Sequence, residues 1–560
     1  MKNVCKYIAF CLCAVLAVIL AVCGPAAAET APAPKNGDVV VLYTSDIHCG
    51  VEKGFGFAGL WQVRETLEAQ GYTTLLVDIG DAIQGEVMGT VTQGEAMIEL
   101  MNAMRYDLAI PGNHEFDYGA DHFLALAEKA DFPYLCCNLE KNGERVFASY
   151  LIREAAGMKI AFVGVTTPTT LTTSTPKYFQ DENGTFVYDF LQDGTGENLY
   201  AAVQEAVDAA RSEGADYVYL LAHLGMLATS SPYTYADVLS HTAGIDVMLD
   251  GHSHDREQVV MKNRDGDPVI RSACGTKLDC IGYSFISAEH GIEETDIWSW
   301  PNKDSAPEIL GIRNEISDAI DAETLEISKL TDKVIARSDV QLTISDPEAT
   351  DESGNPVRMV RRAETNLGNL VADSLRIQTG ADIGVCGGGA IRSDLEKGDI
   401  TYDMVLTVLP FQSQGVIIRA TGQQILDGLE WGARSVPDEH GGFLQVSGLS
   451  YEIDVSVPSG CRNDENGMMT GIEGERRVRS VMVNGQPIDP AKFYTVASTD
   501  YYLLDNGDGF TAFSGAEVLQ SQFKLDSQML IDYIVDDLGG VIGEEYADPF
   551  GQGRIVITGQ

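Results

Sequence analysis

Residues 107–117, with the sequence DLAIPGNHEFD, begin as a short apolar stretch and end in a polar turn that carries asparagine, histidine and two acids. Four other apolar stretches in the first half of the chain end in the same manner. They run into Thr44-Ser45-Asp46-Ile47-His48, Gly80-Asp81, Ala222-His223 and Asp250-Gly251-His252-Ser253-His254. In open α/β folds the carboxyl ends of the strands form the edge at which ligands bind. We therefore expect these polar residues to meet at one edge of a sheet.

The spacing of these stretches predicts a layered α/β domain. The strand candidates are 39–43, 74–79, 107–110, 159–165, 217–221 and 245–249. Helical patterns at 59–70, 94–104 and 199–212 fall between some of them. Alternation of this kind is typical of sheets covered by helices.

The residue types at the strand ends predict a site for two metal ions. Five of the nine histidines of the chain lie in these motifs, together with aspartate and asparagine. A single such histidine would more often be an ordinary hydrogen-bonded residue, but the five motifs together favour a site. Imidazole and carboxylate suit Zn, Mn, Fe or Co, and one carboxylate can bridge two ions. Two ions about 3.5–4 Å apart clamp the attacking and leaving oxygens of phosphoryl transfer.

Together the motifs resemble those of the calcineurin-like metallophosphatases. Two features narrow the resemblance to the 5′-nucleotidase family, namely the string GNHEFD at 112–117 and the second half of the chain. The resemblance implies one metal ion held by Asp46, His48, Asp81 and His254. It implies a second ion held by Asp81, Asn113, His223 and His252, so that Asp81 bridges the two. Some relatives carry glutamine in place of His254. His114, paired with Asp117, would stabilise charge in the transition state and would not be a ligand.

The implied activity is release of phosphate from nucleoside 5′-monophosphates by attack of a metal-bound water. Zinc is the first expectation for the two divalent ions, with Mn, Co, Fe or Mg as alternatives. The same scaffold supports a 2′,3′-cyclic-nucleotide phosphodiesterase with 3′-nucleotidase activity, or a UDP-sugar hydrolase. A catalytically inactive surface protein that binds nucleosides is the remaining alternative.

The second half of the chain resembles the nucleotide-binding domain of the same family. Residues 360–369, VRRAETNLGN, open a predicted helix at 366–378 with Thr365 or Asn366 as its N-cap, and GGGAIR at 387–392 follows a predicted strand at 381–385. The resemblance implies phosphate contacts from Arg361 and Arg392, with Arg362 as a weaker candidate, base stacking by Phe411 and Tyr502, and ribose contacts from Asp508. The chain departs from the family pattern twice. Gly387 stands where relatives often carry asparagine, and Tyr502 stands where phenylalanine is common.

These observations predict a four-layer metallophosphatase β-sandwich flanked by helices, joined by a helix to a second, α+β domain. We assign residues 1–28 to a signal peptide, 38–304 to the metallophosphatase domain, 305–333 to a helical linker and 334–558 to the substrate-binding domain. Further predicted elements of the second domain are strands at 334–343, 415–420 and 493–497 and a helix at 422–432.

The N-terminus predicts export. Lys2 and Lys6 precede an apolar run at 8–22 and a small-residue cleavage site at 26–28. Fifteen apolar residues are short for a membrane-spanning helix, which needs about 20. We therefore expect a secreted, periplasmic or cell-surface protein without a membrane span; a retained anchor and lipid attachment at Cys23 are the alternatives.

Composition limits the partners. The 560 residues include 83 Asp and Glu against 38 Lys and Arg, a net charge of −45, which repels nucleic-acid polymers and anionic membranes. A phosphate-bearing small molecule then needs a local cluster of cations. Seven cysteines follow the signal; Cys274 and Cys280 could pair across a turn, or all could be buried thiols. The sequence does not indicate an oligomeric state.

Overall fold

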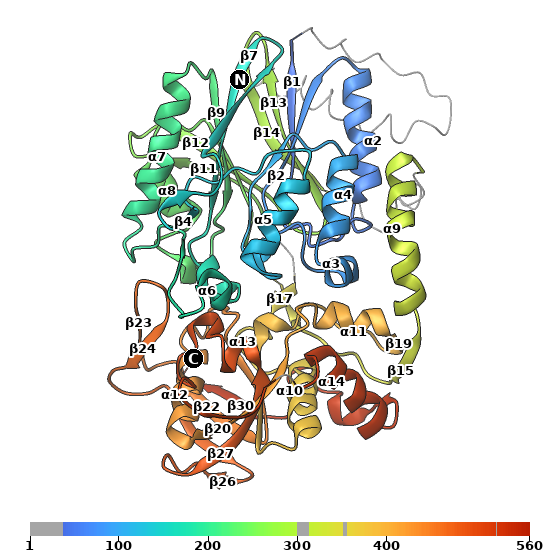
Figure 1. Ribbon diagram of the computed structural model, residues 1–560, viewed down its shortest axis with the longest axis vertical. Helices are drawn as coiled ribbons and strands as arrows, with labels where there is room; N and C mark the ends of the chain where they lie inside the picture. The colour runs from blue at the N-terminus through green and yellow to red at the C-terminus, as the bar shows by residue number, and fades with distance from the viewer. Residues whose placement is uncertain (1–36, 300–312, 351–355, 522, 560) are drawn as a thin grey trace.

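The computed structural model describes residues 37–559 apart from 300–312, 351–355 and 522 (Figure 1). The signal peptide at 1–28, Cys23 and the first part of the expected linker lie outside the described residues. Two domains are stacked along the long axis, with the N-terminal half in blue to green and the C-terminal half in orange to red (Figure 1). Helix α9 (Glu315–Thr331) runs beside the first domain and leads into the second.

The first domain contains two β-sheets packed face to face. One sheet has the strand order β14 (Gly291–Ser299), β13 (Cys280–Ser287), β1 (Val39–Thr44), β2 (Thr73–Asp78) and β3 (Leu108–Ala109). The other has the order β11 (Arg256–Lys262), β12 (Pro268–Cys274), β10 (Val247–Asp250), β9 (Tyr217–His223), β7 (Met158–Thr166) and β6 (Tyr150–Ala155). Buried side chains of both sheets, among them Val41, Tyr43, Phe162 and Tyr219, form one core between them.

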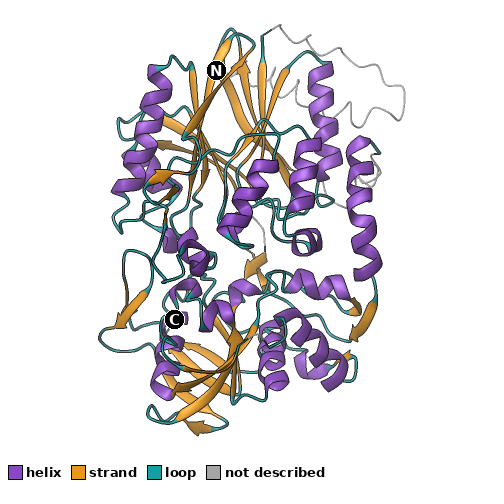
Figure 2. Cartoon of the chain, viewed as in Figure 1, coloured by secondary structure: helices purple, strands orange, loops and turns teal. Residues whose placement is uncertain are grey.

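Helices cover the outer face of each sheet (Figure 2). The first sheet packs against α2 (Gly56–Ala69), α4 (Glu95–Ala103) and α5 (Ala120–Lys129), and the second against α7 (Glu197–Ser212) and α8 (Tyr235–His241). The layers therefore run helix, sheet, sheet, helix. This arrangement confirms the predicted four-layer fold.

Parallel pairing aligns the ends of the strands that carry the polar motifs. Strand β1 pairs in parallel with β2, with Thr44 opposite Asp78, and β10 pairs in parallel with β9, with Asp250 opposite Ala222. Residues that follow paired parallel strands emerge at one edge of a sheet. The register therefore delivers the loops after β1, β2, β9 and β10 to the same side of the domain.

Two predicted strands are shorter in the structure than expected. The strand at 107–110 is only Leu108–Ala109, and Pro111 follows closely with no N–H to donate. The strand at 334–343 is β15 (Val334–Ser338). It ends where the Ser338 hydroxyl donates to the carbonyl of Val340 and accepts from its N–H, a local turn that replaces strand pairing.

The second domain is a mixed α+β structure. A five-stranded sheet runs in the order β21 (Leu444–Ser447), β18 (Ile383–Gly387), β27 (Phe493–Thr499), β20 (Gly415–Thr421) and β28 (Glu517–Gln520). A second sheet runs in the order β26 (Gln486–Pro487), β25 (Val478–Val483), β22 (Leu449–Asp454) and β30 (Ile555–Thr558). The main helices are α10 (Asn366–Thr379), α11 (Tyr402–Val408), α12 (Gly422–Gly432) and α14 (Asp526–Asp532).

Helix α10 begins where the sequence predicts. Thr365 is the N-cap, and its hydroxyl accepts the backbone N–H of Gly368, which satisfies one of the free donors of the first turn. The helix ends at Gly380, which has a left-handed φ of 67°. All seven cysteines among the described residues are free thiols, Cys274 and Cys280 included. Within the described part of the chain, no helix combines the length and apolar character that a bilayer crossing requires.

Helix α9 is anchored to the first domain by one face. Ile316 and Ile320 are 2% and 3% exposed and belong to the core that also contains Trp61 of α2, whereas Leu325 is 56% exposed. The linker segment is therefore a packed helix over Glu315–Thr331.

We expect Ile320→Ala to lower the free energy of unfolding of the first domain by about 2–5 kcal/mol, because it leaves a cavity in that core. Leu325→Ala on the same helix should change the free energy by less than about 0.5 kcal/mol. Urea unfolding followed by tryptophan fluorescence measures both variants. Equal unfolding curves would contradict the packing of α9.

Candidate active site

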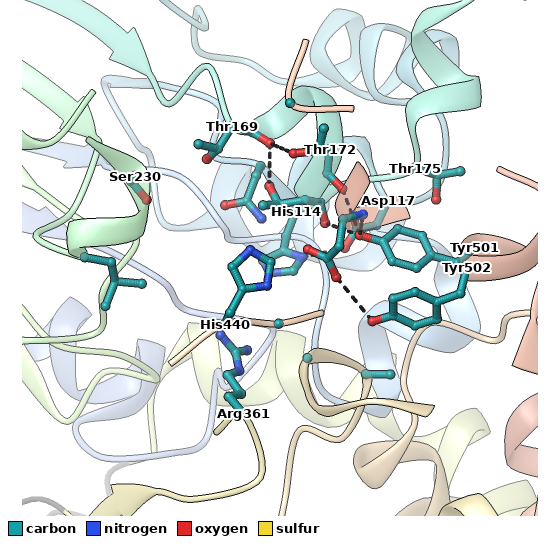
Figure 3. A pocket seen from close by; sticks show the side chains of 18 of the residues that line it. His114, Asp117, Thr169, Thr172, Thr175, Ser230, Arg361, His440, Tyr501 and Tyr502 are labelled. Atoms are coloured by element: carbon teal, nitrogen blue, oxygen red, sulfur yellow. Dashed lines mark hydrogen bonds and ion pairs between the residues drawn. The ribbon is translucent and has the colours of Figure 1, made fainter. Parts of the chain in front are cut away.

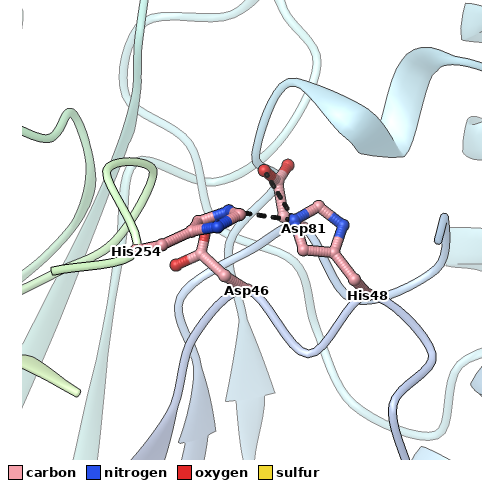
Figure 4. Close-up of side chains that lie close together, drawn as sticks. All are labelled: Asp46, His48, Asp81 and His254. Carbon is pink, nitrogen blue, oxygen red and sulfur yellow. Dashed lines mark hydrogen bonds and ion pairs between the residues drawn. The ribbon is translucent and has the colours of Figure 1, made fainter. Parts of the chain in front are cut away.

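The loops after β1, β2 and β10 bring Asp46, His48, Asp81 and His254 together (Figure 4). Each offers one ligand atom, and these atoms all lie within 4.8 Å of one another. His48 Nε2 lies 3.1 Å from His254 Nε2 and 3.9 Å from Asp81 Oδ2, and His254 Nε2 lies 3.4 Å from Asp46 Oδ1. Ring nitrogens and carboxylates that converge in this way form a suitable cage for a divalent cation.

A second group shares Asp81 with the first. Asp81, His223 and His252 again offer ligand atoms within 4.8 Å of one another. His223 Nε2 is buried 3.1 Å from Asp81 Oδ2 and makes no hydrogen bond. The side-chain oxygen of Asn113 is also buried without a partner among the described residues. Orphaned buried acceptors are rare in folded proteins, and a bound cation would satisfy both atoms.

The histidine tautomers also fit metal binding. The Nδ1 atom of His48 lies 2.8 Å from the carbonyl oxygen of Gln84, and that of His223 lies 2.7 Å from the carbonyl oxygen of Ile79. A proton on Nδ1 donates to each carbonyl and leaves the Nε2 lone pair free, as in metal-bound histidines. Burial lowers the pKa of His48 and His254 well below the usual value, which favours the neutral, ligating form. At His223 burial acts in the same direction, but the charge of Asp81 outweighs it and raises the pKa to about 10, so this ring would release a proton on binding a cation.

Five of the seven expected ligands adopt left-handed backbone conformations. The φ angles are 50° for Asp46, 47° for His48, 58° for Asp81, 80° for His252 and 59° for His254. Such conformations are unfavourable for residues with a side chain and concentrate at functional sites. The loops are therefore held by their surroundings in the shape that aims these side chains inward.

Glu115 is a residue of the GNHEFD motif to which sequence reasoning assigns no role. Its carboxylate is 1% exposed and accepts the backbone N–H groups of Gly112 at 2.6 Å, Asp81 at 2.8 Å and Ala82 at 2.7 Å. These bonds fasten the loop that carries Asn113 to the loop that carries Asp81. A glutamate two positions after the expected ligand Asn113 was the available signal.

His114 and Asp117 form the expected dyad. His114 Nδ1 lies 2.5 Å from Asp117 Oδ2, and the His114 backbone N–H donates to Asp81 Oδ1 at 2.8 Å. The imidazole ring stands 5.3 Å from the ring of His48 and 5.8 Å from the ring of Phe411, measured between centroids. The dyad therefore lies between the metal-ligand groups and the second domain.

A cavity of about 730 Å³ lies between the domains and is lined by both. Figure 3 shows His114, Asp117, Thr169 and Thr172 of the first domain on the same cavity as Tyr501 and Tyr502 of the second. Of the expected site residues, Asp46, His48, His223 and the weaker candidate Arg362 do not line the cavity. The others do, namely Asp81, Asn113, His114, Asp117, His252, His254, Arg361, Arg392, Phe411, Tyr502 and Asp508. The structure thus gathers these residues at one cavity.

Arginines of the second domain face the metal-ligand groups. The guanidinium groups of Arg361 and Arg392 make no ion pair with any described residue, whereas Arg358 pairs with Glu439 at 2.9 Å. Arg392 lies 5.8 Å from the centre of the Phe411 ring. Burial and the charge of nearby Arg358 lower the pKa of Arg392 to about 10. Guanidinium groups that line a cavity and form no ion pair favour an anionic ligand.

The two departures from the family pattern touch each other. A Cβ atom on Gly387 would lie 1.7 Å from the hydroxyl oxygen of Tyr502. Gly387 has φ −70° and ψ 138°, which any residue adopts, so glycine is needed here for space. The Tyr502 hydroxyl fills that space and donates to Asp508 Oδ2 at 3.2 Å. Asp508 itself has a left-handed φ of 51°.

Three cavity residues near Asp508 were not expected. Trp431 Nε1 donates to the Asp508 carbonyl oxygen at 2.9 Å, Arg434 stacks 3.9 Å from the centre of the Trp431 ring, and Arg434 donates to His440 Nε2 at 2.7 Å. His440 lies outside the strand-end motifs, and sequence reasoning set it aside. Its position next to Gly441 and Gly442 was the only local signal, and glycine pairs are common in ordinary turns.

Each half of the chain matches the model of a known protein family. Residues 39–256 match the calcineurin-like phosphoesterase family model, and residues 334–515 match that of the 5′-nucleotidase C-terminal domain. The chain is 26% identical to protein UshA of Escherichia coli strain K12, over 90% of this chain and 94% of UshA. It is also 26% identical to the trifunctional nucleotide phosphoesterase protein YfkN of Bacillus subtilis, over 86% of this chain, but spans only 33% of YfkN.

Among solved structures, the 5′-nucleotidase precursor from Thermus thermophilus superposes with a TM-score of 0.76 at 25% identity, over 93% of this chain and 100% of that chain. A calcineurin-like domain with two groups of metal ligands, facing a second domain across one cavity, defines a two-domain metallophosphatase. The chain therefore combines a calcineurin-like phosphoesterase domain with a 5′-nucleotidase C-terminal domain. It is a hydrolase of the metallophosphatase type and is similar over most of its length to 5′-nucleotidases.

The contact between residues 387 and 502 can be tested by stability. We expect Gly387→Ala to lower the free energy of unfolding of the second domain by about 1–3 kcal/mol, because the new methyl group displaces the Tyr502 ring. Gly471 lies in a strand with no atom within 4 Å of its would-be Cβ. Gly471→Ala is the matched control and should be neutral in the same thermal or urea unfolding experiment. Equal stability of the two variants would refute the steric coupling.

Proposed function

We propose that this protein is a 5′-nucleotidase, which hydrolyses nucleoside 5′-monophosphates to nucleosides and phosphate. The observation that carries the proposal is the single cavity shared by the metal-ligand groups, the unpaired Arg361 and Arg392, and the Tyr502–Asp508 pair. A nucleoside monophosphate has a dianionic end and a flat, hydrogen-bonding end. Both ends would find matching chemistry among the residues that line this cavity.

The proposed ligand set is Asp46, His48, Asp81 and His254 for one ion and Asp81, Asn113, His223 and His252 for the other. Two divalent ions, with zinc the first expectation, would supply an activated water and neutralise the phosphoryl oxygens. Around them the protein fixes the geometry. The left-handed ligand loops and Glu115 hold the donor atoms in place before any substrate arrives.

His114 is placed to stabilise charge on the phosphoryl group or on the departing ribose oxygen. Its Nδ1 is occupied by Asp117, which orients the ring. As an imidazolium, His114 would then present the proton on Nε2 to the substrate. Arg392, next to Phe411 on the facing wall, would hold the phosphoryl oxygens through its guanidinium fork.

The second domain would bind the nucleoside. Phe411 and Tyr502 present aromatic rings to the cavity, and stacking between such rings tolerates different bases. The Asp508 carboxylate, held by the Tyr502 hydroxyl, would accept hydrogen bonds from the ribose hydroxyls. The split of phosphate and nucleoside contacts between the domains makes productive binding depend on both.

Other nucleotide phosphoesters are the second candidate class. The match to YfkN, described as a trifunctional nucleotide phosphoesterase, favours tests on cyclic and 3′-nucleotides. A cavity of about 730 Å³ also has room for a nucleotide sugar. An inactive nucleoside-binding protein is disfavoured because the ligand groups and the His114–Asp117 pair are all in place.

We also infer that the protein acts outside the cytoplasmic membrane. The support is the basic, apolar and small-residue sequence of positions 1–28. Cleavage after Ala28 would release the mature chain.

A substrate panel tests the activity. With Zn, Mn, Co or Mg supplied in turn, we expect phosphate release from AMP to exceed that from 3′-AMP, 2′,3′-cyclic AMP and UDP-glucose by at least about tenfold in kcat/KM. His114→Ala should lower kcat by about 10²–10⁴-fold, and Asp81→Ala should abolish turnover. Leu325→Ala, on the exposed face of α9, should retain full activity. Preference for 3′-AMP would refute the 5′ assignment, and equal turnover of the His114 and Asp81 variants with wild type would refute the site.

The pH dependence of binding tests the role of Asp508. Burial raises the pKa of Asp508 to about 6. The carboxylate accepts hydrogen bonds above this pH and is protonated below it, so the KM for AMP should rise about tenfold between pH 7 and pH 5. Asp508→Asn should have a high KM that rises less over this pH range, because only the protonation of the AMP phosphate is left to change it. Identical pH profiles of KM for the variant and wild type would remove Asp508 from the nucleoside site.

A further inference from the structure

Arg271 is a fully buried cation in the first domain that the catalytic scheme above does not use. It lies on β12 and has 0% exposure. Its guanidinium donates to Asp250 Oδ2 from Nε at 3.0 Å and from Nη2 at 2.7 Å. It also donates to both carboxylate oxygens of Asp255, from Nη2 at 3.0 Å and from Nη1. The face of the guanidinium covers the ring of Tyr235 at 4.4 Å from its centre.

The two carboxylates flank one metal-ligand loop. Asp250 is the last residue of β10, and Asp255 comes directly before β11. Between them lies Gly251-His252-Ser253-His254, which carries one proposed ligand to each metal ion. Arg271 therefore holds both ends of this loop at once. A lysine could not do so, because it lacks the planar fork that binds two carboxylates.

The same cluster reaches the loop that carries His223. The other oxygen of Asp250, Oδ1, accepts the backbone N–H groups of Leu224 at 3.1 Å and Gly225 at 3.2 Å. Across the two loops, the Met226 N–H donates to the Ser253 hydroxyl at 2.7 Å. Three proposed ligands, His223, His252 and His254, thus depend on backbone that this cluster fastens.

The loop needs such fastening. His252 and His254 both have left-handed backbone angles, with φ of 80° and 59°, and residues with side chains leave that region when nothing holds them. Glu257, 3.5 Å from Arg271, is the third carboxylate at the guanidinium, so the buried positive charge is fully compensated. A compensated buried ion network costs desolvation energy and is a poor source of stability alone. Its position around the ligand loop points to a different purpose.

We propose that Arg271, Asp250 and Asp255 form a positioning cluster. By holding the backbone of the loops that carry the ligands, this cluster sets the geometry of both proposed metal sites. It rests on the ligand set proposed above and adds residues that contact no substrate and no metal. Loss of the Arg271 guanidinium would leave the ligand side chains present, but their backbone could leave the left-handed conformation. The effect is expected on metal affinity, with only a secondary effect on turnover at saturating metal.

The test uses full-length protein stripped of metal and titrated with Zn²⁺ against a chromophoric chelator, without substrate. Wild type should bind two ions. Arg271→Lys and Asp255→Asn should bind Zn²⁺ about 10–100-fold more weakly, the usual effect of losing a residue that orients metal ligands. Excess Zn²⁺ should restore the kcat of both variants toward wild type and leave the KM for substrate unchanged.

The matched control is Arg554→Gln in the second domain. Arg554 forms a two-pronged ion pair with Asp373, at 2.9 and 2.8 Å, far in sequence from the metal-ligand loops. This variant should lower thermal stability and leave Zn²⁺ affinity unchanged, which separates positioning from general structural support. If Arg271→Lys does not fold, Asp255→Asn, whose side chain is 14% exposed in wild type, decides the question.

Two failures can be told apart. Failure of wild type to bind Zn²⁺ would overturn the ligand set itself. Wild-type affinity in Asp255→Asn, or in a folded Arg271→Lys, would overturn the positioning cluster and leave the ligand set standing.

Discussion

The carboxylate of Asp81 is the contact on which the rest of the site depends. It faces His223 and His48, accepts the backbone N–H of His114, and belongs to both groups of metal ligands. Coulomb repulsion would drive two cations apart at such short range if no anion lay between them. In the proposed two-metal site, the carboxylate of Asp81 would lie between the two cations and offset their repulsion. Strand β1 pairs in register with β2, and β9 pairs in register with β10. This pairing places the loops that carry the other candidate ligands next to Asp81.

The strong negative charge of the chain makes the local distribution of cations decisive. A net charge of −45 opposes any phosphate at long range, but screening in salt limits that field to roughly 10 Å. Inside the cavity Arg361 and Arg392 form no ion pair with any described residue. Because these arginines come from the second domain and the candidate metal ligands come from the first, the cations that a phosphate needs would meet in the cavity between the two domains.

The sequence predicted what depends on local pattern. The strand-end motifs located residues that the structure brings together in two candidate groups of metal ligands. An N-cap at Thr365 or Asn366 and a helix at 422–432 were also predicted closely. What could not be predicted depends on contacts between distant segments. Arg271 sits in an ordinary strand pattern, and only the pairing of β12 with β10 and β11 reveals the carboxylates around it. Arg434 and Trp431 lie at the cavity because both side chains donate hydrogen bonds to the carbonyl oxygen of Asp508, which is far from them in the chain.

The pairing of Gly387 with Tyr502 couples two positions that lie far apart in the chain. A Cβ atom at position 387 would lie 1.7 Å from the hydroxyl oxygen, 2.2 Å from Cζ and 2.9 Å from Cε2 of Tyr502, so any side chain at 387 requires the whole ring to move. Exchange of the tyrosine for phenylalanine would remove only the first of these three contacts. The residue tolerated at either position is therefore set by the placement of the side chain at the other.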